Sequence, residues 1–313
     1  MRCHSQSHAR THARTHARSE VPLRNIKIGL AQIAPRLGDV NANLQKHLDY
    51  IGQAREQGVE LLLFPELSIT GYSLRDLTPD VALPARADDP VFARLLAAAG
   101  DMDVVVGFVE QSSRYLYYNS AAYLSAGQLW HVYRKVYLPT FTLFDESRFW
   151  AAGDRLRAFD TRFGRLALTI CRDAWQVSMA YLSVMDGADL ILTISAAPGW
   201  SSTPAEPRLS RALGWDYLIR HTANLFTVYY AYCNRVGVED GVSFSGGSIV
   251  AGPTGNAVTR APDLEEAMVT ATVDARALDR QRQRSPFLRD EKLDLVRREL
   301  DRIARERSEG FER

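Results

Sequence analysis

Residues 61–66 read LLLFPE, a run of four apolar side chains that closes on proline and glutamate. The apolar run predicts a short buried strand. A predicted strand over residues 26–33 and a predicted helix over residues 41–57 come before it. A predicted helix over residues 90–99 and a strand over residues 104–108 come after it. This alternation predicts an α/β architecture in which helices cover the faces of sheets.

Hairpin pairs join this alternation further along the chain. Two predicted strands, over residues 115–124 and 129–133, turn at Ala126-Gly127. No linker rich in Gly, Pro or Ser interrupts residues 21–313, so we expect a single domain there. The other predicted elements are strands over residues 166–170, 190–195, 226–232, 248–251 and 268–273, helices over 175–185 and 208–224, and a charged helix and tail from Asp274 onward.

Residues 1–20 read MRCHSQSHARTHARTHARSE and carry four of the seven histidines at four-residue spacing. A His-rich tract can bind metal. The segment has almost no apolar side chains to bury, however, so we expect a disordered tail. It also lacks the apolar stretch that a signal peptide needs.

The composition excludes several classes of protein. The 313 residues carry 38 basic and 37 acidic side chains, a net charge of +1, which gives no support to a nucleic-acid or acidic-membrane partner. Three cysteines do not suggest a disulfide framework and favour a reducing cytoplasm. No apolar run reaches the roughly 18 residues that a membrane helix needs. Only four of the basic residues are lysine, which makes Lys135, in mid-chain, worth explaining.

Three reactive side chains follow predicted strands. Glu66 comes after residues 61–64, Lys135 after residues 129–133, and Cys171 between a predicted strand and helix. A helix N-terminus and a neighbouring cation would lower the pKa of the Cys171 thiol. Partial burial would raise the pKa of Glu66 toward that of a general base. Taken singly, each also has an ordinary interpretation, as an inert buried cysteine, a surface ion pair or a solvated lysine.

Together, these segments resemble the nitrilase superfamily of carbon–nitrogen hydrolases, which uses a Glu-Lys-Cys triad. The resemblance extends over roughly residues 25–290, and the order and spacing of its segments make it far more specific than any single motif. The segments that carry it are FPELSITGY (64–72), RKVYLP (134–139) and ICRDAW (170–175), with the opening strand 26–34 and the late stretches NRVG (234–237), FSGGS (244–248) and PTG (253–255).

The resemblance implies a four-layer α-β-β-α sandwich with Cys171 as nucleophile, Glu66 as general base and Lys135 as stabiliser of the transition state. It also implies that Glu146, in the stretch FDE (144–146), holds Lys135 or assists proton transfer. No metal or organic cofactor is expected, and the substrate would be a small molecule. At least a homodimer is expected, with the charged stretch from Asp290 to Arg313 packing across the interface or on its own subunit.

The sequences of residues 70–77 and 144–149 most resemble those of the glutaminase-type domains of glutamine-dependent NAD synthetases. That branch typically has an acidic residue after the nucleophile, and this chain has Arg172. We also expect no fused synthetase domain, because the 313 residues leave no room for one. We therefore expect hydrolysis of a small linear amide or N-carbamoyl compound. The alternatives are a nitrile hydrolase, an ammonia-donating glutaminase subunit, and a catalytically silent binding module.

Several other side chains are candidates for the substrate pocket. Tyr72, Trp175 and Trp200 would line it, although such aromatic residues are as often simply core. Arg172 would contact an anionic substrate group or pair with a nearby acid. Cys233 lies late in a predicted apolar strand and is expected to be core. His47, His131 and His221 form no spaced ligand cluster, so we expect structural or surface roles for them.

Overall fold

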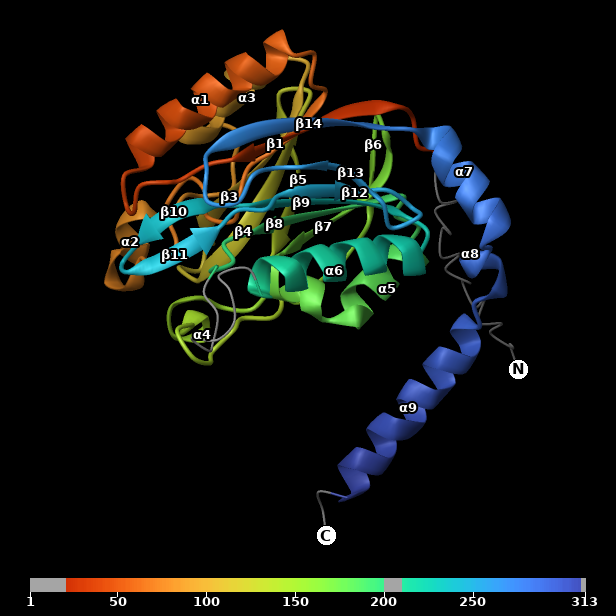
Figure 1. Cartoon of the computed structure of the whole chain (residues 1–313). Helices are drawn as coiled ribbons and strands as arrows, with labels where there is room; N and C mark the ends of the chain where they lie inside the picture. The colour runs from red at the N-terminus through yellow and green to blue at the C-terminus, as the bar shows by residue number, and fades with distance from the viewer. Residues whose placement is uncertain (1–20, 200–209, 311–313) are drawn as a thin grey trace, which may run out of the picture.

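A computed structural model describes residues 21–199 and 210–310, and the predicted Trp200 contact lies outside them. Two six-stranded sheets pack face to face, and helices cover both outer faces (Figure 1). This arrangement confirms the four-layer α-β-β-α sandwich. No described helix combines the length and the apolar character needed to cross a membrane.

The first sheet has parallel strands at its centre and antiparallel strands at its edges. Helices α1 (Val40–Glu56) and α3 (Pro90–Ala99) cover its outer face. Asp39 and Asp89 begin these helices by accepting hydrogen bonds from backbone N–H groups of the first turn. The strand order is β14 (Ala267–Val273), β1 (Ile26–Gln32), β2 (Leu61–Leu63), β3 (Asp103–Gln111), β4 (Tyr117–Ser125) and β5 (Gln128–Arg134).

The second sheet repeats this plan, and α5 (Val177–Met185) and α6 (Ser210–Leu225) cover its outer face. Its strands β7 (Gly164–Ile170), β8 (Leu190–Ser195) and β9 (Tyr229–Asn234) run parallel to one another. A separate two-stranded ribbon, β10 (Val236–Glu239) and β11 (Val242–Ser245), follows β9. The strand order is β13 (Ala257–Arg260), β12 (Ile249–Ala251), β9 (Tyr229–Asn234), β8 (Leu190–Ser195), β7 (Gly164–Ile170) and β6 (Phe159–Thr161).

The core lies between the sheets, where the central strands of both contribute side chains to one buried cluster. The strands there are buried on both faces, which is why they read as nearly continuous apolar runs. Burial of one Val, Leu or Ile side chain in this core contributes about 1.5–3 kcal/mol to stability. Central members of the cluster are Ile28, Leu63 and Val105 from the first sheet and Leu168, Ile194 and Ala231 from the second.

Two of the predicted boundaries that differ from the structure have a clear physical reason. The strand predicted from residue 226 begins at Tyr229, because the N–H groups of Phe226 and Val228 are still bonded to carbonyl groups of α6. The helix predicted from residue 175 begins at Val177. The residues before it form a short 3₁₀ helix, η2 (Cys171–Trp175), and Gln176 is extended.

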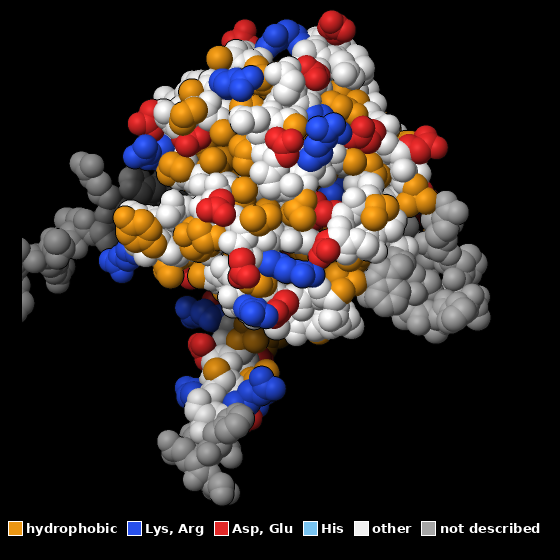
Figure 2. All heavy atoms as spheres, turned by 90° about the vertical axis from the view of Figure 1, so that its left-hand side faces the viewer, with side chains coloured by type: hydrophobic (Ala, Val, Ile, Leu, Met, Phe, Trp, Pro, Cys, Tyr) orange, Lys and Arg blue, Asp and Glu red, His pale blue; other side chains and the backbone are white. Residues whose placement is uncertain are grey.

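Three helices form the C-terminal part of the chain, where the sequence predicts one charged helix and a tail. They are α7 (Ala275–Arg284), α8 (Phe287–Asp290) and α9 (Leu293–Gly310). In Figure 1 α9 extends away from the sandwich. The face shown in Figure 2 intersperses basic and acidic side chains, so no extended field of one sign covers it.

Candidate active site

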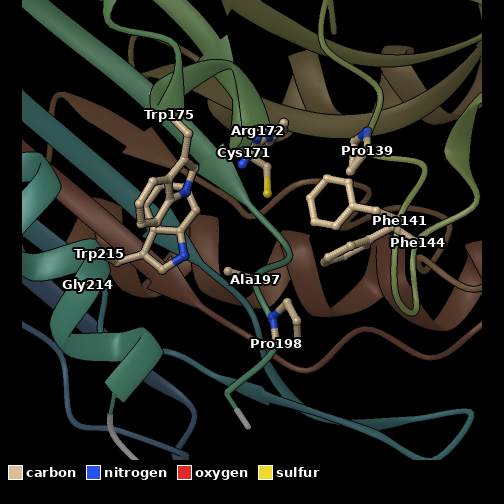
Figure 3. A pocket seen from close by; sticks show the side chains of 10 residues that line it. All are labelled: Pro139, Phe141, Phe144, Cys171, Arg172, Trp175, Ala197, Pro198, Gly214 and Trp215. Atoms are coloured by element: carbon tan, nitrogen blue, oxygen red, sulfur yellow. The ribbon is translucent and has the colours of Figure 1, made fainter. Parts of the chain in front are cut away.

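Cys171 lies at the junction between β7 and η2, where the sequence predicts it. The preceding residue, Ile170, is the last of β7, and Cys171 is the first of η2. Its φ of +44° is uncommon for a residue with a side chain and stores backbone strain. The thiol points into a cavity (Figure 3). Strained backbone at a strand-to-helix turn is one way a fold presents a reactive group at a sheet edge.

Glu66 follows β2 and is completely buried. Its Oε1 accepts hydrogen bonds from Lys135 Nζ at 2.7 Å and from Asn119 Nδ2 at 2.7 Å. Its Oε2 accepts one from the backbone N–H of Ala196 at 2.6 Å. These donors come from three different segments, so the carboxylate is held in one orientation.

Lys135 follows β5, and its side chain is also completely buried. Nζ lies 2.7 Å from Glu66 Oε1 and 2.7 Å from Glu146 Oε1. Burial alone would lower the pKa of the ammonium, but the charges of Glu146 and Glu66 outweigh it and raise the pKa above its usual value. Lys135 is therefore a fixed positive charge, which the structure brings together with both glutamates.

Glu146 begins the single-turn helix α4 (Glu146–Phe149). Tyr72 donates a hydrogen bond from its hydroxyl to Glu146 Oε1 at 2.6 Å. Burial raises the pKa of Glu146 to about 7, although Lys135 acts in the opposite direction. A carboxyl group that titrates near neutrality thus lies behind the lysine.

The Cys171 thiol differs from its sequence-based prediction. A helix N-terminus and a cation predict a lowered pKa, but burial raises it, and the negative charge of Glu66 raises it further. Lys135 opposes both without overcoming them. Because η2 has only five residues and Cys171 is buried, the neutral thiol is favoured over the thiolate, and a base would have to take its proton for the sulfur to act as a nucleophile.

The cavity in front of Cys171 has a volume of about 330 Å³, at the small end for a ligand site. Figure 3 shows the sulfur between two aromatic walls, Trp175 with Trp215 on one side and Phe141 with Phe144 on the other. Arg172 also lines this cavity. The described residues that line the cavity are Pro139, Phe141, Phe144, Cys171, Arg172, Trp175, Ala197, Pro198, Gly214 and Trp215.

Tyr72 is placed differently from its prediction. It is bonded to Glu146 and lines a separate cavity of about 490 Å³, together with Trp150 and Phe244. It therefore supports the buried charge cluster and is not among the described residues that line the cavity beside Cys171. The reason is its position after the Glu66 loop, where Glu239 accepts hydrogen bonds from the backbone N–H groups of Tyr72 and Ser73.

Two polar residues of the site were not predicted from the sequence. Asn119 lies within β4, where nothing in its own surroundings marks it. Asp173 accepts hydrogen bonds from the Tyr133 hydroxyl and from the backbone N–H groups of Val136, Tyr137 and Ile170. Its place two residues after Cys171, in a segment that otherwise turns sharply, is the signal that could have found it.

The remaining candidates lie away from this cavity. Cys233 is fully buried in β9, as predicted, and its Sγ contacts the carbonyl of Leu63. His47 is buried between Asn43 and Ser68, and burial lowers its pKa to about 4. Across residues 21–199 and 210–310, no three His, Cys, Asp or Glu side chains gather as a metal site would require.

These features define the class of protein. Two α-covered sheets, with Glu66, Lys135 and Cys171 at the ends of β2, β5 and β7, form the fold of the nitrilase superfamily. The chain belongs to the carbon-nitrogen hydrolase family, whose sequence profile matches residues 27–283.

Comparison with known proteins gives two kinds of relative. A glutamine-dependent NAD(+) synthetase of Thermotoga maritima is 32% identical over 256 residues, covering 80% of this chain and 42% of the synthetase. A probable nitrilase of Schizosaccharomyces pombe is 31% identical over 255 residues, covering 79% of this chain and 88% of the relative. The chain thus spans less than half the length of the synthetase.

A solved structure agrees with the fold. Saccharomyces cerevisiae Nit3, described as a member of branch 10 of the nitrilase superfamily, superposes with a TM-score of 0.75 at 26% identity. The match covers 86% of this chain and 97% of Nit3. The solved structure thus agrees with the family that the sequence profile gives.

Proposed function

We propose that this chain hydrolyses the carbon–nitrogen bond of a small linear amide or N-carbamoyl compound through a thioester on Cys171. The observation that carries the proposal is the convergence of Glu66, Lys135 and Cys171. The side chains of Glu66 and Lys135 are completely buried, and Glu66 Oε1 lies 2.7 Å from Lys135 Nζ. The charge of Glu66 raises the pKa of the Cys171 thiol, and the charge of Lys135 lowers it. Perturbed buried groups beside a cavity are typical of catalytic sites.

The first step is attack by Cys171 on the substrate carbonyl, with transfer of the thiol proton to Glu66. Glu66 can accept this proton because Oε2 has one hydrogen-bond donor, the N–H of Ala196, and a carboxylate oxygen has two lone pairs. A sulfur–carbon bond forms and the carbonyl oxygen becomes an oxyanion. The Lys135 ammonium and the backbone N–H of Arg172 stabilise that oxyanion.

Collapse of the intermediate breaks the carbon–nitrogen bond. Glu66 returns the proton to the leaving nitrogen, and ammonia or an amine departs. Water, deprotonated by Glu66, then attacks the thioester and releases the acid and the Cys171 thiol. Glu146 keeps Lys135 in place throughout, because Nζ lies between the two glutamates.

The same residues support alternative substrates. A nitrile would react with the same thiol. The 32% sequence identity to a glutamine-dependent NAD(+) synthetase favours a second candidate, a glutaminase subunit that supplies ammonia to a separate enzyme. A silent binding module would have no need for a complete buried triad.

We also propose a reducing cytoplasmic setting, since Cys171 and Cys233 are both free thiols.

The test is ammonia release from a panel of small amides, N-carbamoyl compounds, glutamine and nitriles, with Cys171→Ala as the inactive variant. Cys233→Ala is the matched control, because it removes the other buried thiol of the core. We expect release with the wild type and Cys233→Ala but not with Cys171→Ala. Absence of ammonia release from every compound of the panel would favour the silent module.

A further inference from the structure

The cavity beside Cys171 contains one charged side chain among its described residues, Arg172, and its other lining is largely aromatic or proline. The Arg172 guanidinium lies 5.2 Å from the centroid of the Phe141 ring. Within residues 21–199 and 210–310, Arg172 has no ion pair or hydrogen bond to an acid. A cation in the wall of an otherwise apolar cavity favours the binding of an anion.

The contact with Phe141 explains how the cation is held. The face of an aromatic ring attracts a guanidinium, and stacking leaves the N–H groups at its edge free. Those N–H groups match the two oxygens of a carboxylate. Arg172 is thus held in place by an interaction that does not use its hydrogen-bond donors.

We propose, building on the proposed amide hydrolysis, that the substrate is a short amide whose far end carries a carboxylate, and that Arg172 binds this carboxylate. Arg172 follows Cys171 directly, so its guanidinium lies within one side-chain length of the nucleophile. The amide carbon and the carboxylate are therefore joined by a short chain. The aromatic walls contact the methylene groups of that chain.

This cavity also disfavours glutamine. Glutamine carries an ammonium group beside its carboxylate, and none of the described lining residues is acidic. The ammonium would lose its hydration against Trp175 and Phe144 with no acidic partner among the described lining residues, which is unfavourable. A monoamide of a simple dicarboxylic acid has the anion without that ammonium.

The experiment compares kcat/KM for succinamate with that for 4-methylpentanamide, in which an isopropyl group replaces the carboxylate with nearly the same shape. The wild type should prefer succinamate by at least about tenfold, since charge-assisted hydrogen bonds are among the strong ones. Arg172→Gln should lower this ratio at least about tenfold, and Arg172→Lys should retain part of it. Glutamine should react more slowly than succinamate.

Arg155→Gln is the control, because Arg155 is an exposed arginine that lines a different cavity. It removes the same charge and should leave the ratio unchanged. The inference is overturned if the wild type hydrolyses the neutral amide as well as succinamate, a comparison that needs no variant. It is also overturned if Arg172→Gln slows both substrates equally. If neutral amides react and succinamate does not, only this inference fails. If neither an amide nor an N-carbamoyl compound reacts, the proposed hydrolysis fails as well.

Discussion

Burial and neighbouring charges set the protonation states of individual residues in this site. Cys171 keeps its proton because burial and the charge of Glu66 both raise the pKa of the thiol. In the proposed mechanism the same glutamate removes that proton, so the group that disfavours the resting thiolate would also generate the thiolate when a substrate is bound. A buried thiol of this kind should be protected from unselective oxidation until a substrate fills the cavity.

Glu146 should make the stability of the chain pH-dependent. Its pKa is raised to about 7 by burial, so the folded state binds this proton more tightly than the unfolded state does. The resulting stability is fully present below the unfolded pKa and is lost as pH rises through about 7. The Glu146→Gln variant lacks this titration. Between pH 4.5 and 8, its free energy of unfolding should therefore fall by about 1–3 kcal/mol less than that of the wild type.

Urea unfolding at pH 4.5 and pH 8 measures this difference. Glu306→Gln, on an exposed face of α9, is the control and should behave as the wild type does. Identical pH dependence in Glu146→Gln and the wild type would show that Glu146 does not hold a proton at neutral pH.

Individual residues were predictable where a motif marks them. Glu66, Lys135 and Cys171 each follow a recognisable strand, and the structure brings them together. Asn119 and Tyr72 depend on partners far away in sequence, Glu66 and Glu146, whose positions only the folded chain defines. The sequence could therefore point to the reactive groups and, through the family resemblance, to Glu146, but not to Asn119 or to the position of Tyr72.

At the scale of elements, Asp173 joins the ends of two strands from different sheets. Its carboxylate accepts from Tyr133, Val136 and Tyr137 near the end of β5, and from Ile170 at the end of β7. These segments carry Lys135 and Cys171. Their relative position thus depends on one buried carboxylate.

Asp173→Asn should therefore reduce both stability and turnover. The amide replaces one acceptor oxygen by a donor that faces N–H groups, which should destabilise the fold by about 2–4 kcal/mol. We expect kcat to fall at least about tenfold with a smaller change in KM, because the alignment of the lysine and the sulfur is disturbed. Asp88→Asn, at an exposed position, should alter neither quantity. Unchanged kcat in folded Asp173→Asn would contradict a positioning role.

Gly107 in β3 lets the Glu66 loop pass close to the sheet. A Cβ at this position would lie 2.4 Å from Leu67 N and 2.5 Å from Pro65 O, both backbone atoms beside Glu66. Gly107→Ala should displace the loop, cost about 1–3 kcal/mol, and lower kcat at least about tenfold.

The matched control is Gly52→Ala in α1, where a Cβ meets no atom within 4 Å. Alanine should stabilise that helix by up to about 1 kcal/mol and leave kcat unchanged. Thermal unfolding and steady-state kinetics of both variants measure the contrast. Equal effects of the two substitutions would show that the close approach at Gly107 is unimportant.

The layout of the elements was largely predictable, because apolar periodicity is strong in the central strands and in α1 and α3. The pairs β10–β11 and β6–β7 were not predicted in full. Strands as short as β6 (Phe159–Thr161) contain too few residues to show a period, and their conformation is fixed by the pairing itself. Similarly, η2 forms where β7 ends in a strained turn rather than where helical periodicity begins.

At the scale of the whole molecule, α9 presents apolar side chains to solvent in a single chain. Leu293, Leu300 and Ile303 are 53%, 60% and 41% exposed and recur near helical spacing. Burying such a row against a second copy would stabilise an assembly. We therefore predict at least a dimer by light scattering at micromolar concentration.

Leu300→Glu combined with Ile303→Glu should shift the assembly toward the monomer. Arg298→Glu, on the same helix, is the control for the added charge. A monomeric mass for the wild type would contradict the prediction, and an unchanged dimer in the double variant would place the interface elsewhere.

The central claim, covalent catalysis by Cys171, is tested most directly by mass spectrometry of a reaction that acid has stopped within the first turnovers. The account predicts a protein mass increased by the acyl group of the substrate, with the added mass on the peptide that contains Cys171, and no adduct or ammonia from Cys171→Ala. Undiminished ammonia release by Cys171→Ala, or an adduct on the Cys233 peptide, would contradict it.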